Sequence, residues 1–328
     1  MTRVGAAALA GVGALGLLAG WWFFSADAGP PRGGAPGDDD LALVTALLDG
    51  ATSEPPRDVL LAGEGELYLA RASERTVVAV AKKGGATRAL AKLDTPAQGM
   101  ALAGGALWVT TGRALEKIAV TGGEPQAVAV GLTRPRAVAS DGRWVFVVDV
   151  DANRTGMTRG SAVVRIPAEG GERVTLGRSE GEIPDLALDD ANVYWADRLE
   201  GTLVSVPKAG GAPRVVASER GLPGSVVVAG DALTWVEKRS ESVWTVPRSG
   251  GTPRRVAQDF AGFANLVVDA RGLFWTNEAA VEGGFRVLTA TESGDAKPVS
   301  PVVDAVAALA SDGARLYWER GGVVEEVP

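Results

Sequence analysis

Apolar and polar positions along this chain repeat as a unit of about 40 residues. One unit runs from Asp185 to Ala217, where a short apolar run, an aromatic pair, a Val-Pro segment and a Gly-Gly turn follow one another. The next unit begins at Ser225 and repeats each part as VVVAGDALTWVE, SVWTVP and SGGTPRRVA. Self-similarity at this period is typical of repeat folds, so the repeat predicts the architecture before any single motif does.

One position of the unit is large and apolar in every copy, and it gives the spacing of the repeats. Taken as the second member of the aromatic pair, it is occupied by Tyr68, Trp108, Val147, Trp195, Trp235, Trp275 and Trp318. The steps between these residues are 40, 39, 48, 40, 40 and 43. A period near 40 with four strand-like segments in each copy predicts an all-β fold, a seven-bladed β-propeller.

Each unit is predicted to form four antiparallel strands. The first is a run of small apolar residues, which suits the crowded inner strand near the propeller axis. The second carries an aromatic pair such as Tyr194 and Trp195, and successive strand residues point to opposite faces, so each neighbouring blade receives one large side chain. The third strand often ends in Val-Pro, and a Gly-Gly turn such as Gly210-Gly211 leads to the fourth strand.

The two ends of the propeller segment are predicted to close the ring. The seventh unit stops after its third strand, whereas Leu41–Leu48 precedes the first unit with the spacing of a fourth strand. We expect Leu41–Leu48 to pair with Val323–Val327 and complete blade seven, which would remove open sheet edges. The alternative for this segment is a helix, because Leu and Ala have high helix propensity.

The first 28 residues are predicted to be a membrane anchor or a signal peptide. Arg3 precedes an uncharged run, Val4–Phe24, which is long enough to span a bilayer as a helix and ends in four aromatic residues. Its length favours an uncleaved anchor, and the segment Ala26–Ala28 offers the alternative of a cleavage site.

Residues 29–40 are rich in Gly, Pro and Asp and are predicted to be a flexible linker, which leaves residues 41–328 for the propeller. With either fate of the first segment the propeller is exported. It is expected to face the periplasm from the inner membrane, or to be periplasmic or secreted if residues 1–28 are cleaved.

The segment from Tyr194-Trp195-Ala-Asp197 through Gly201-Thr-Leu-Val-Ser-Val-Pro207 to Gly210-Gly211-Ala-Pro resembles the YWTD-like and NHL-like repeats of exported bacterial propellers. These proteins are also described as TolB-like or SMP-30-like six- or seven-bladed propellers. The likeness covers residues 41–328 and is strongest at 183–278, although YWTD domains usually have six blades. The resemblance implies a binding or scaffolding module, while lactonases and lyases share the architecture.

Composition narrows the possible chemistry. The net charge of −7 argues against a nucleic-acid partner, because phosphate binding requires a basic surface. The chain has no Cys and no His, so disulfides, thiol chemistry and His-based catalytic triads are excluded. We therefore predict no catalytic residue.

Equivalent positions in four successive units carry an oxygen ligand two residues after the repeated large residue. They are Asp149, Asp197, Glu237 and Asn277, and Asp151 adds a D-x-D-x-N spacing within the longer third unit. Such a set could hold Ca²⁺, which prefers oxygen ligands. In the alternative interpretation, which we favour, the carboxylates satisfy backbone N–H groups of nearby turns. The third unit lacks the Gly and Glu of a calcium loop, so a solvated polar loop is expected there.

The connections between units are predicted to form a binding face, because they share one side of the propeller with the turns between the second and third strands. Candidate residues on this face are Gln98, Arg134, Arg136, Glu182, Asp185, Phe260, Phe263 and Asn265. Mixed charges with two phenylalanines suit a protein or peptide partner. The same residues could instead only cap the central channel.

The leading functional hypothesis is a non-enzymatic propeller at the cell envelope that binds a protein or peptide through this variable face. The alternative is a Ca²⁺-dependent hydrolase or lyase of the lactonase type, built on the four oxygen-ligand positions. A third hypothesis, a glycan-binding lectin, depends on exposed aromatic side chains. The position of the Trp residues in the second strand predicts instead that they are buried between blades.

Overall fold

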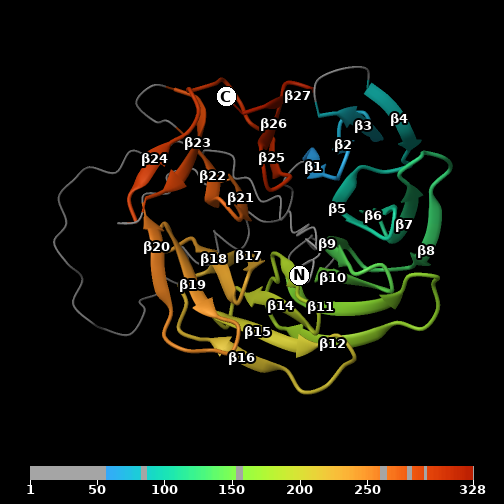
Figure 1. Ribbon diagram of the computed structural model, residues 1–328. Helices are drawn as coiled ribbons and strands as arrows, with labels where there is room; N and C mark the ends of the chain where they lie inside the picture. Colours follow the sequence, from blue (N-terminus) through green and yellow to red (C-terminus); the bar gives the residue numbers. More distant parts are fainter. Residues whose placement is uncertain are drawn as a thin grey trace, which may run out of the picture.

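The computed structural model describes residues 57–82, 87–152, 158–258, 264–278, 283–291 and 294–327. In these residues, 27 strands form seven antiparallel sheets around a central axis, so the seven-bladed propeller is confirmed (Figure 1). No helix of the described residues is long and apolar enough to cross a membrane. The predicted anchor, the linker and the closing strand at Leu41–Leu48 lie outside the described residues.

Blades one to four each contain four strands. Blade one consists of β1 (Val59–Ala62), β2 (Glu66–Arg71), β3 (Thr76–Ala81) and β4 (Thr87–Lys92). Blade two consists of β5 (Ala97–Ala103), β6 (Ala106–Thr111), β7 (Ala114–Ala119) and β8 (Gln126–Val130). Blade three consists of β9 (Pro135–Ser140), β10 (Trp144–Ala152), β11 (Thr158–Pro167) and β12 (Val174–Ser179). Blade four consists of β13 (Leu186–Leu188), β14 (Asn192–Asp197), β15 (Thr202–Pro207) and β16 (Arg214–Ala217).

The last three blades complete the circle. Blade five consists of β17 (Pro223–Ala229), β18 (Ala232–Glu237), β19 (Ser242–Pro247) and β20 (Arg254–Gln258). Blade six consists of β21 (Ala264–Asp269), β22 (Gly272–Glu278), β23 (Phe285–Ala290) and β24 (Ala296–Pro298). Blade seven has three described strands, β25 (Ala308–Ser311), β26 (Leu316–Arg320) and β27 (Val323–Glu326).

The antiparallel order gives the propeller two different faces. One face carries the connections between blades and the turns between second and third strands, for example residues 180–185 and 198–201 of blade four. We call it the connection face. The opposite face carries the turns between first and second strands and between third and fourth strands, for example residues 189–191 and 208–213. We call it the turn face.

The hydrophobic core lies between adjacent blades, because each sheet buries both of its faces. In blade four, Trp195 packs against blade three and Tyr194 packs against blade five. Trp318 and Tyr317 divide in the same way between blades six and one. All four side chains are at most 2% exposed. The aromatic pair of the second strand therefore joins three consecutive blades, as the alternation of side chains along a strand predicts.

In the first two blades the equivalence predicted from the aromatic residues is wrong by one residue. Tyr68 packs against blade two and Trp108 against blade three, as Tyr194 packs against blade five. The residues equivalent to Trp195 are therefore Leu69 and Val109, which face the preceding blade. A lone aromatic residue does not show which neighbouring blade it contacts, and a shift of one residue exchanges the two faces.

Blades seven and one pack directly against each other and close the ring of described residues. Their inner strands β25 and β1 lie side by side (Figure 1). Leu60 and Leu69 of blade one share a buried cluster with Ala308 and Tyr317 of blade seven. On the connection face, the Arg71 guanidinium donates a hydrogen bond to the carbonyl of Gly322, 3.1 Å away. The predicted fourth strand of blade seven stays a prediction.

The insertion in blade three extends a hairpin. Asp149–Ala152 continue β10 and pair with residues 158–162 of β11, where a solvated loop was expected. Strand pairing satisfies the backbone groups of this segment, which a loop would leave to solvent. Because second strands end at the connection face, the additional length projects from that face, and residues 153–157 lie outside the described residues.

Candidate functional site

Asp149, the first of the predicted oxygen-ligand positions, fixes the connection that enters its own blade. Its carboxylate accepts hydrogen bonds from the backbone N–H groups of Thr133, at 2.9 Å, and Arg134, at 2.8 Å. Both donors belong to the segment that leads from blade two into blade three. This contact is the structural role that Asp commonly has at turns and strand ends.

Glu237 holds the connection that enters blade five. Only 4% of this residue is exposed, and its carboxylate accepts hydrogen bonds from Arg220 Nε at 2.9 Å and from the Gly221 N–H at 3.0 Å. Ser240 Oγ donates a third bond at 2.5 Å. A buried carboxylate requires such compensation, because removing its charge from water is costly.

Asp197 and Asn277 are also buried, at 4% and 7% exposed. Asp197 accepts a hydrogen bond from the N–H of Glu200, 3.0 Å away, within the turn that follows β14. Asn277 Oδ1 has no hydrogen-bond partner among the described residues. Asp151 is exposed and lies opposite Gly160 in the β10–β11 hairpin.

These positions do not converge on a metal centre within the described part of the chain. There, no group of three or more His, Cys, Asp or Glu side chains is arranged to hold a metal ion. Ca²⁺ takes six to eight oxygen ligands. The carboxylates of Asp149, Asp197 and Glu237 instead accept backbone N–H groups of their own blades. The contacts thus follow the structural interpretation of these acids, and a metal role stays a prediction.

Asp185 is the candidate with the most perturbed environment. It directly precedes β13, the inner strand of blade four, is 3% exposed, and accepts a hydrogen bond from the N–H of Leu186 at 2.8 Å. Burial raises the pKa of Asp185 to about 7, against the opposing effect of the N–H groups of Leu186 and Val226. This carboxyl group therefore changes charge near neutral pH. The equivalent positions in the other blades are uncharged: Val59, Gly99, Ala137, Ser225, Asn265 and Ala308.

The remaining candidates of the connection face differ in accessibility. Gln98, Arg134, Arg136 and Glu182 are half-buried, and Phe260 and Phe263 lie outside the described residues. Burial, and then the charge of Arg136, lower the pKa of Arg134, while Glu182 opposes this shift. Asn265 is 4% exposed, has a φ of 56°, and donates a hydrogen bond to Thr276 Oγ1 at 3.3 Å.

Four segments of the connection face form one continuous surface across blades three to five. We define the blade three–five surface as residues 160–161, 179–183, 198–201 and 218–222. Ser161 Oγ donates to the carbonyl of Gly181 at 3.0 Å and accepts from the N–H of Ile183 at 3.2 Å, which joins the first two segments. The N–H of Arg220 donates to the carbonyl of Gly201 at 2.9 Å, which joins the last two.

Leu199 lies at the centre of this surface. It is 53% exposed, yet a Cβ added at Gly181 would lie 2.4 Å from Leu199 Cβ, so the leucine packs closely against the neighbouring connection. Arg198 forms a half-buried ion pair with Glu182, which holds the same turn from its other side. The surface therefore presents a large apolar side chain whose position is fixed before any partner binds.

Sequence reasoning identified Glu182 but missed Leu199, Arg198 and Ser161. One sequence feature could have indicated these residues: each of three segments that meet here contains a glycine, Gly181, Gly201 or Gly221. Gly201 has a φ of 61°, and a Cβ there would lie 2.5 Å from the carbonyl oxygen of Arg220. The repeat alone does not reveal that such a glycine contacts the next segment.

Five tryptophans of the second strands are buried. Trp108, Trp195, Trp235, Trp275 and Trp318 are at most 2% exposed. Trp144 and Trp244 are half-buried, and each ring has an arginine over it. The guanidinium carbon of Arg165 lies 4.4 Å from the Trp144 ring centroid, and that of Arg220 lies 4.2 Å from the Trp244 ring centroid. The five buried tryptophans are therefore not available as the exposed aromatic residues that the lectin hypothesis requires.

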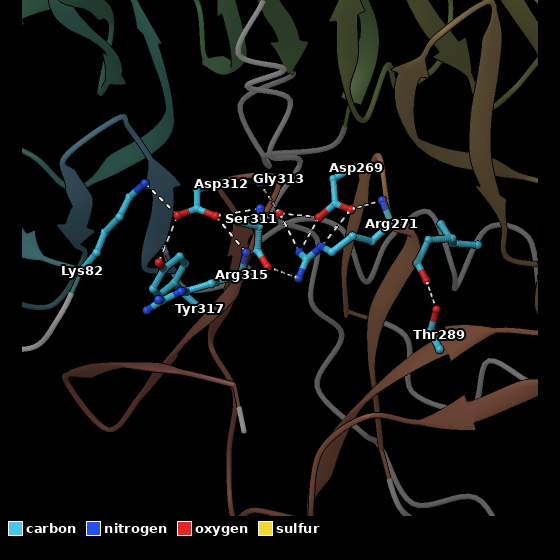
Figure 2. A network of polar contacts seen from close by, with 11 residues as sticks. Lys82, Asp269, Arg271, Thr289, Ser311, Asp312, Gly313, Arg315 and Tyr317 are labelled. Carbon is cyan, nitrogen blue, oxygen red and sulfur yellow. Dashed lines mark hydrogen bonds and ion pairs between the residues drawn. The ribbon is translucent and has the colours of Figure 1, made fainter. Parts of the chain in front are cut away.

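The turn face carries a polar network across the junction of blades seven and one (Figure 2). Asp312 accepts hydrogen bonds from Lys82 Nζ at 2.8 Å and Tyr317 Oη at 3.0 Å, and from the N–H groups of Ala314 and Arg315. These contacts outweigh burial and hold the pKa of Asp312 well below its usual range. Burial and the neighbouring Asp312 raise the pKa of Tyr317 to about 12.

A second part of the network joins blade six to blade seven. Asp269 pairs with the Arg271 guanidinium at 2.5 Å and accepts a hydrogen bond from Ser311 Oγ (Figure 2). Arg271 also donates to the carbonyl of Ala314 at 2.7 Å. This face is therefore held together by ion pairs and hydrogen bonds between blades.

Comparison with solved structures supports the fold. The chain is similar to a streptogramin B lyase with a TM-score of 0.65 and 11% identity, over 84% of this chain and 95% of that one. It is similar to virginiamycin B lyase from Staphylococcus aureus with a TM-score of 0.63 and 13% identity, over 81% and 92% of the two chains. It is also similar to a chain of a mitotic checkpoint complex with a TM-score of 0.64 and 13% identity, over 84% of this chain and 89% of that one.

No protein-family model matches this sequence, and no curated protein matches it. At identities of 11–13%, these structural similarities establish the propeller architecture and nothing about activity. They include both lyases and a protein assembly.

Proposed function

We propose that this protein is a non-enzymatic binding module that recognises a protein or peptide through the blade three–five surface of its connection face. The observation that carries the proposal is Leu199, a half-exposed apolar side chain held in place by Gly181 and by the Arg198–Glu182 ion pair. A fixed apolar anchor surrounded by charged groups suits a protein interface, because little side-chain entropy is lost when the partner binds.

The chemistry of the chain supports binding over catalysis. One similar structure is described as a catalytically inactive variant of virginiamycin B lyase in which a histidine is replaced by alanine. The present chain has no histidine in its 328 residues, so it lacks the side chain whose loss inactivates that lyase. The checkpoint-complex chain, in contrast, belongs to a protein assembly, which is the kind of role proposed here.

We also propose that Val4–Phe24 anchors the protein in the inner membrane, with the propeller on the periplasmic side. The support is the length of the uncharged run and the single Arg3 before it. Protease added to intact spheroplasts should then degrade the propeller, and membrane fractionation should retain the full-length chain. A full-length chain that resists protease until lysis would contradict export.

The binding proposal is tested by site-specific photocrosslinking of the full chain in cells. A photoreactive residue at Leu199 should give one discrete crosslinked protein, and a photoreactive residue at Val215 should not. Val215 is a matched control because it is 56% exposed in the same blade but lies on the outer strand β16.

A second variant tests whether the crosslink depends on the Leu199 side chain. With the photoreactive residue at position 180, Leu199→Asp should abolish the crosslink while the unfolding temperature stays unchanged. Equal crosslinking from positions 199 and 215, or a crosslink that survives Leu199→Asp, would refute this surface as the binding site. If instead Ca²⁺ raises the unfolding temperature and Asp197→Ala with Glu237→Ala removes that rise, the metal-dependent lactonase or lyase alternative is favoured.

A further inference from the structure

On the turn face, a three-residue contact joins successive blades. In blade four, Tyr194 Oη donates to Asp189 at 2.6 Å, and Asp189 pairs with Arg248, which directly follows the third strand of blade five. The same contact joins blade seven to blade one through Tyr317, Asp312 and Lys82. In both cases the Asp precedes the Tyr by five residues. We call this arrangement the Tyr–Asp–cation clasp.

An arginine of the fourth strand adds a second contact between blades. Arg214 of β16 donates to the carbonyls of Arg248 at 2.7 Å and Ser249 at 3.1 Å, both in blade five. Arg88 of β4 occupies the same position in blade one and donates to two carbonyls of the next blade at 3.0 and 3.1 Å. In both blades the arginine satisfies carbonyls at the end of the following third strand.

Neither contact forms between blades five and six. Thr234 occupies the position of Tyr194, Ala229 occupies the position of Asp189, and Thr291 occupies the position of Arg248. Arg254 is equivalent to Arg214, because Thr245 pairs with Arg254 as Ser205 pairs with Arg214. The Arg254 side chain is exposed, and no hydrogen bond or ion pair joins its guanidinium to the described residues.

The missing ring and carboxylate leave a groove of about 460 Å³ at this junction. On the side of blade five it is lined by three residues that lie side by side across neighbouring strands, Thr234, Thr245 and Arg254. On the side of blade six it is lined by Leu273 and Ala290. Arg255 is also at its edge. The volume is within the range of small-molecule sites. The apolar floor beside the Arg254 guanidinium suits a ligand that combines an apolar part with an anionic group.

We propose that the groove between blades five and six binds a small organic anion with a flat apolar ring. The Arg254 guanidinium holds the oxyanion, a carboxylate or a phosphate, because its planar fork forms paired hydrogen bonds with such groups. The ring lies against Leu273 and Ala290, in the space that Tyr194 fills at the preceding junction.

Calorimetric titration of the full chain tests this site with phenyl phosphate, benzoate and inorganic phosphate as probes. We expect binding of at least one ring-bearing anion and weaker binding of inorganic phosphate, which lacks the ring. The ratio between phenyl phosphate and benzoate identifies which oxyanion is preferred. Absence of heat with both aromatic probes at millimolar concentration overturns the proposal.

Substitutions locate the site. Arg254→Gln should weaken binding about tenfold, because a hydrogen bond between charged groups is lost. Arg255→Gln should have a smaller effect, because adjacent strand residues point to opposite faces. Arg178→Gln makes the same change of charge at an exposed arginine of β12 and should leave the affinity unchanged. Equal losses in Arg254→Gln and Arg178→Gln would show non-specific attraction and refute the site.

A third variant rebuilds the clasp. Ala229→Asp with Thr234→Tyr and Thr291→Lys should fill the groove and abolish binding, and its unfolding temperature shows whether it folds. If it does not fold, the comparison of Arg254→Gln with Arg178→Gln still decides the question. This site lies on the face opposite Leu199, so its failure is distinguishable from failure of the proposed partner surface.

Discussion

Four acids of the turn face and three acids of the connection face have pKa values shifted in opposite directions. On the turn face, burial is outweighed by hydrogen-bond donors, and the pKa is lowered for Asp141, Asp189, Asp269 and Asp312. On the connection face, burial is the largest cause and the pKa is raised for Asp58, Asp185 and Glu319. Ionised carboxylates therefore stabilise the fold on the turn face, whereas the ionised form of the three acids on the connection face destabilises it.

The difference follows from where each face obtains its hydrogen-bond donors. Turn-face acids meet a Lys or Arg, such as Lys82, Lys208 or Arg248, in addition to backbone N–H groups. Asp185 meets only backbone N–H groups in its buried position. A turn-face acid stabilises the fold above its unfolded pKa near 3.8, and this stability is lost as the pH falls. For Asp185 the charge becomes a cost as the pH rises from about 4 to about 7.

The largest expected effect is a gain in stability from Asp185→Asn at alkaline pH. The rise of its pKa from 3.8 to about 7 corresponds to about 4 kcal/mol in the free energy of unfolding at pH 8. The variant should match the wild type at pH 4 and exceed it increasingly up to pH 7. Denaturant unfolding at pH 4, 6 and 8 measures this difference, and a constant difference across the three would contradict the buried-charge account.

Asp312→Asn should destabilise the protein at neutral pH by about 3 kcal/mol, because it leaves Lys82 unpaired at 15% exposure. The difference from wild type should shrink as the pH falls below the unfolded pKa near 3.8, because Asp312 then binds a proton in the unfolded protein while the folded protein keeps it ionised. Thermal unfolding at pH 7 and pH 3 measures both effects. Asp190→Asn is the matched control, since Asp190 is an exposed turn-face residue in blade four. Equal unfolding temperatures for the two variants would show that the Asp312 clasp does not hold blades seven and one together.

A smaller loss, about 1 kcal/mol, is expected from Asp149→Ala on the connection face. The substitution removes the acceptor of the Thr133 and Arg134 N–H groups, which partly regain water because this connection is at the surface. Thermal unfolding with and without Ca²⁺ separates this loss from a metal effect. A Ca²⁺-dependent rise in the wild type that disappears in Asp149→Ala would favour the calcium interpretation instead.

The smallest effect is expected where blades seven and one meet on the connection face. Burial, and to a lesser degree the charge of Asp58, raise the pKa of Glu319, so Asp58→Asn with Glu319→Gln should stabilise the protein slightly at pH 7. The gain should be smaller than that of Asp185→Asn, because Asp58 is only half-buried. Thermal unfolding at pH 5 and pH 7 should show the gain at the higher pH, and a loss at both would contradict it.

Much of the fold followed from the sequence because its signals are local. Alternation along strands such as Asn192–Asp197 and the recurrence of Gly-Gly turns specify the sheets, and the period near 40 specifies the number of blades. The acids at Asp149, Asp197 and Glu237 were correctly placed on one face. The equivalence of Tyr68 and Trp108 was not, because a lone aromatic residue fits either side of a blade.

The candidate site was less predictable, because its residues act between repeats. Leu199 is an ordinary turn residue in the sequence, and only the structure shows that this exposed residue packs against Gly181 of the neighbouring connection. Thr234 and Arg254 likewise become informative only beside Tyr194 and Arg214, their equivalents at a junction where the contacts form.

The sequence by itself determined the blade, the number of blades and the face on which each acid lies, since these depend on periods of two and about 40 along one chain. Only the tertiary structure decided which acids are paired with a cation and which junctions form the Tyr–Asp–cation clasp. Burial and charge pairing arise between blades, and a partner such as Lys82 lies 230 residues from Asp312 along the chain.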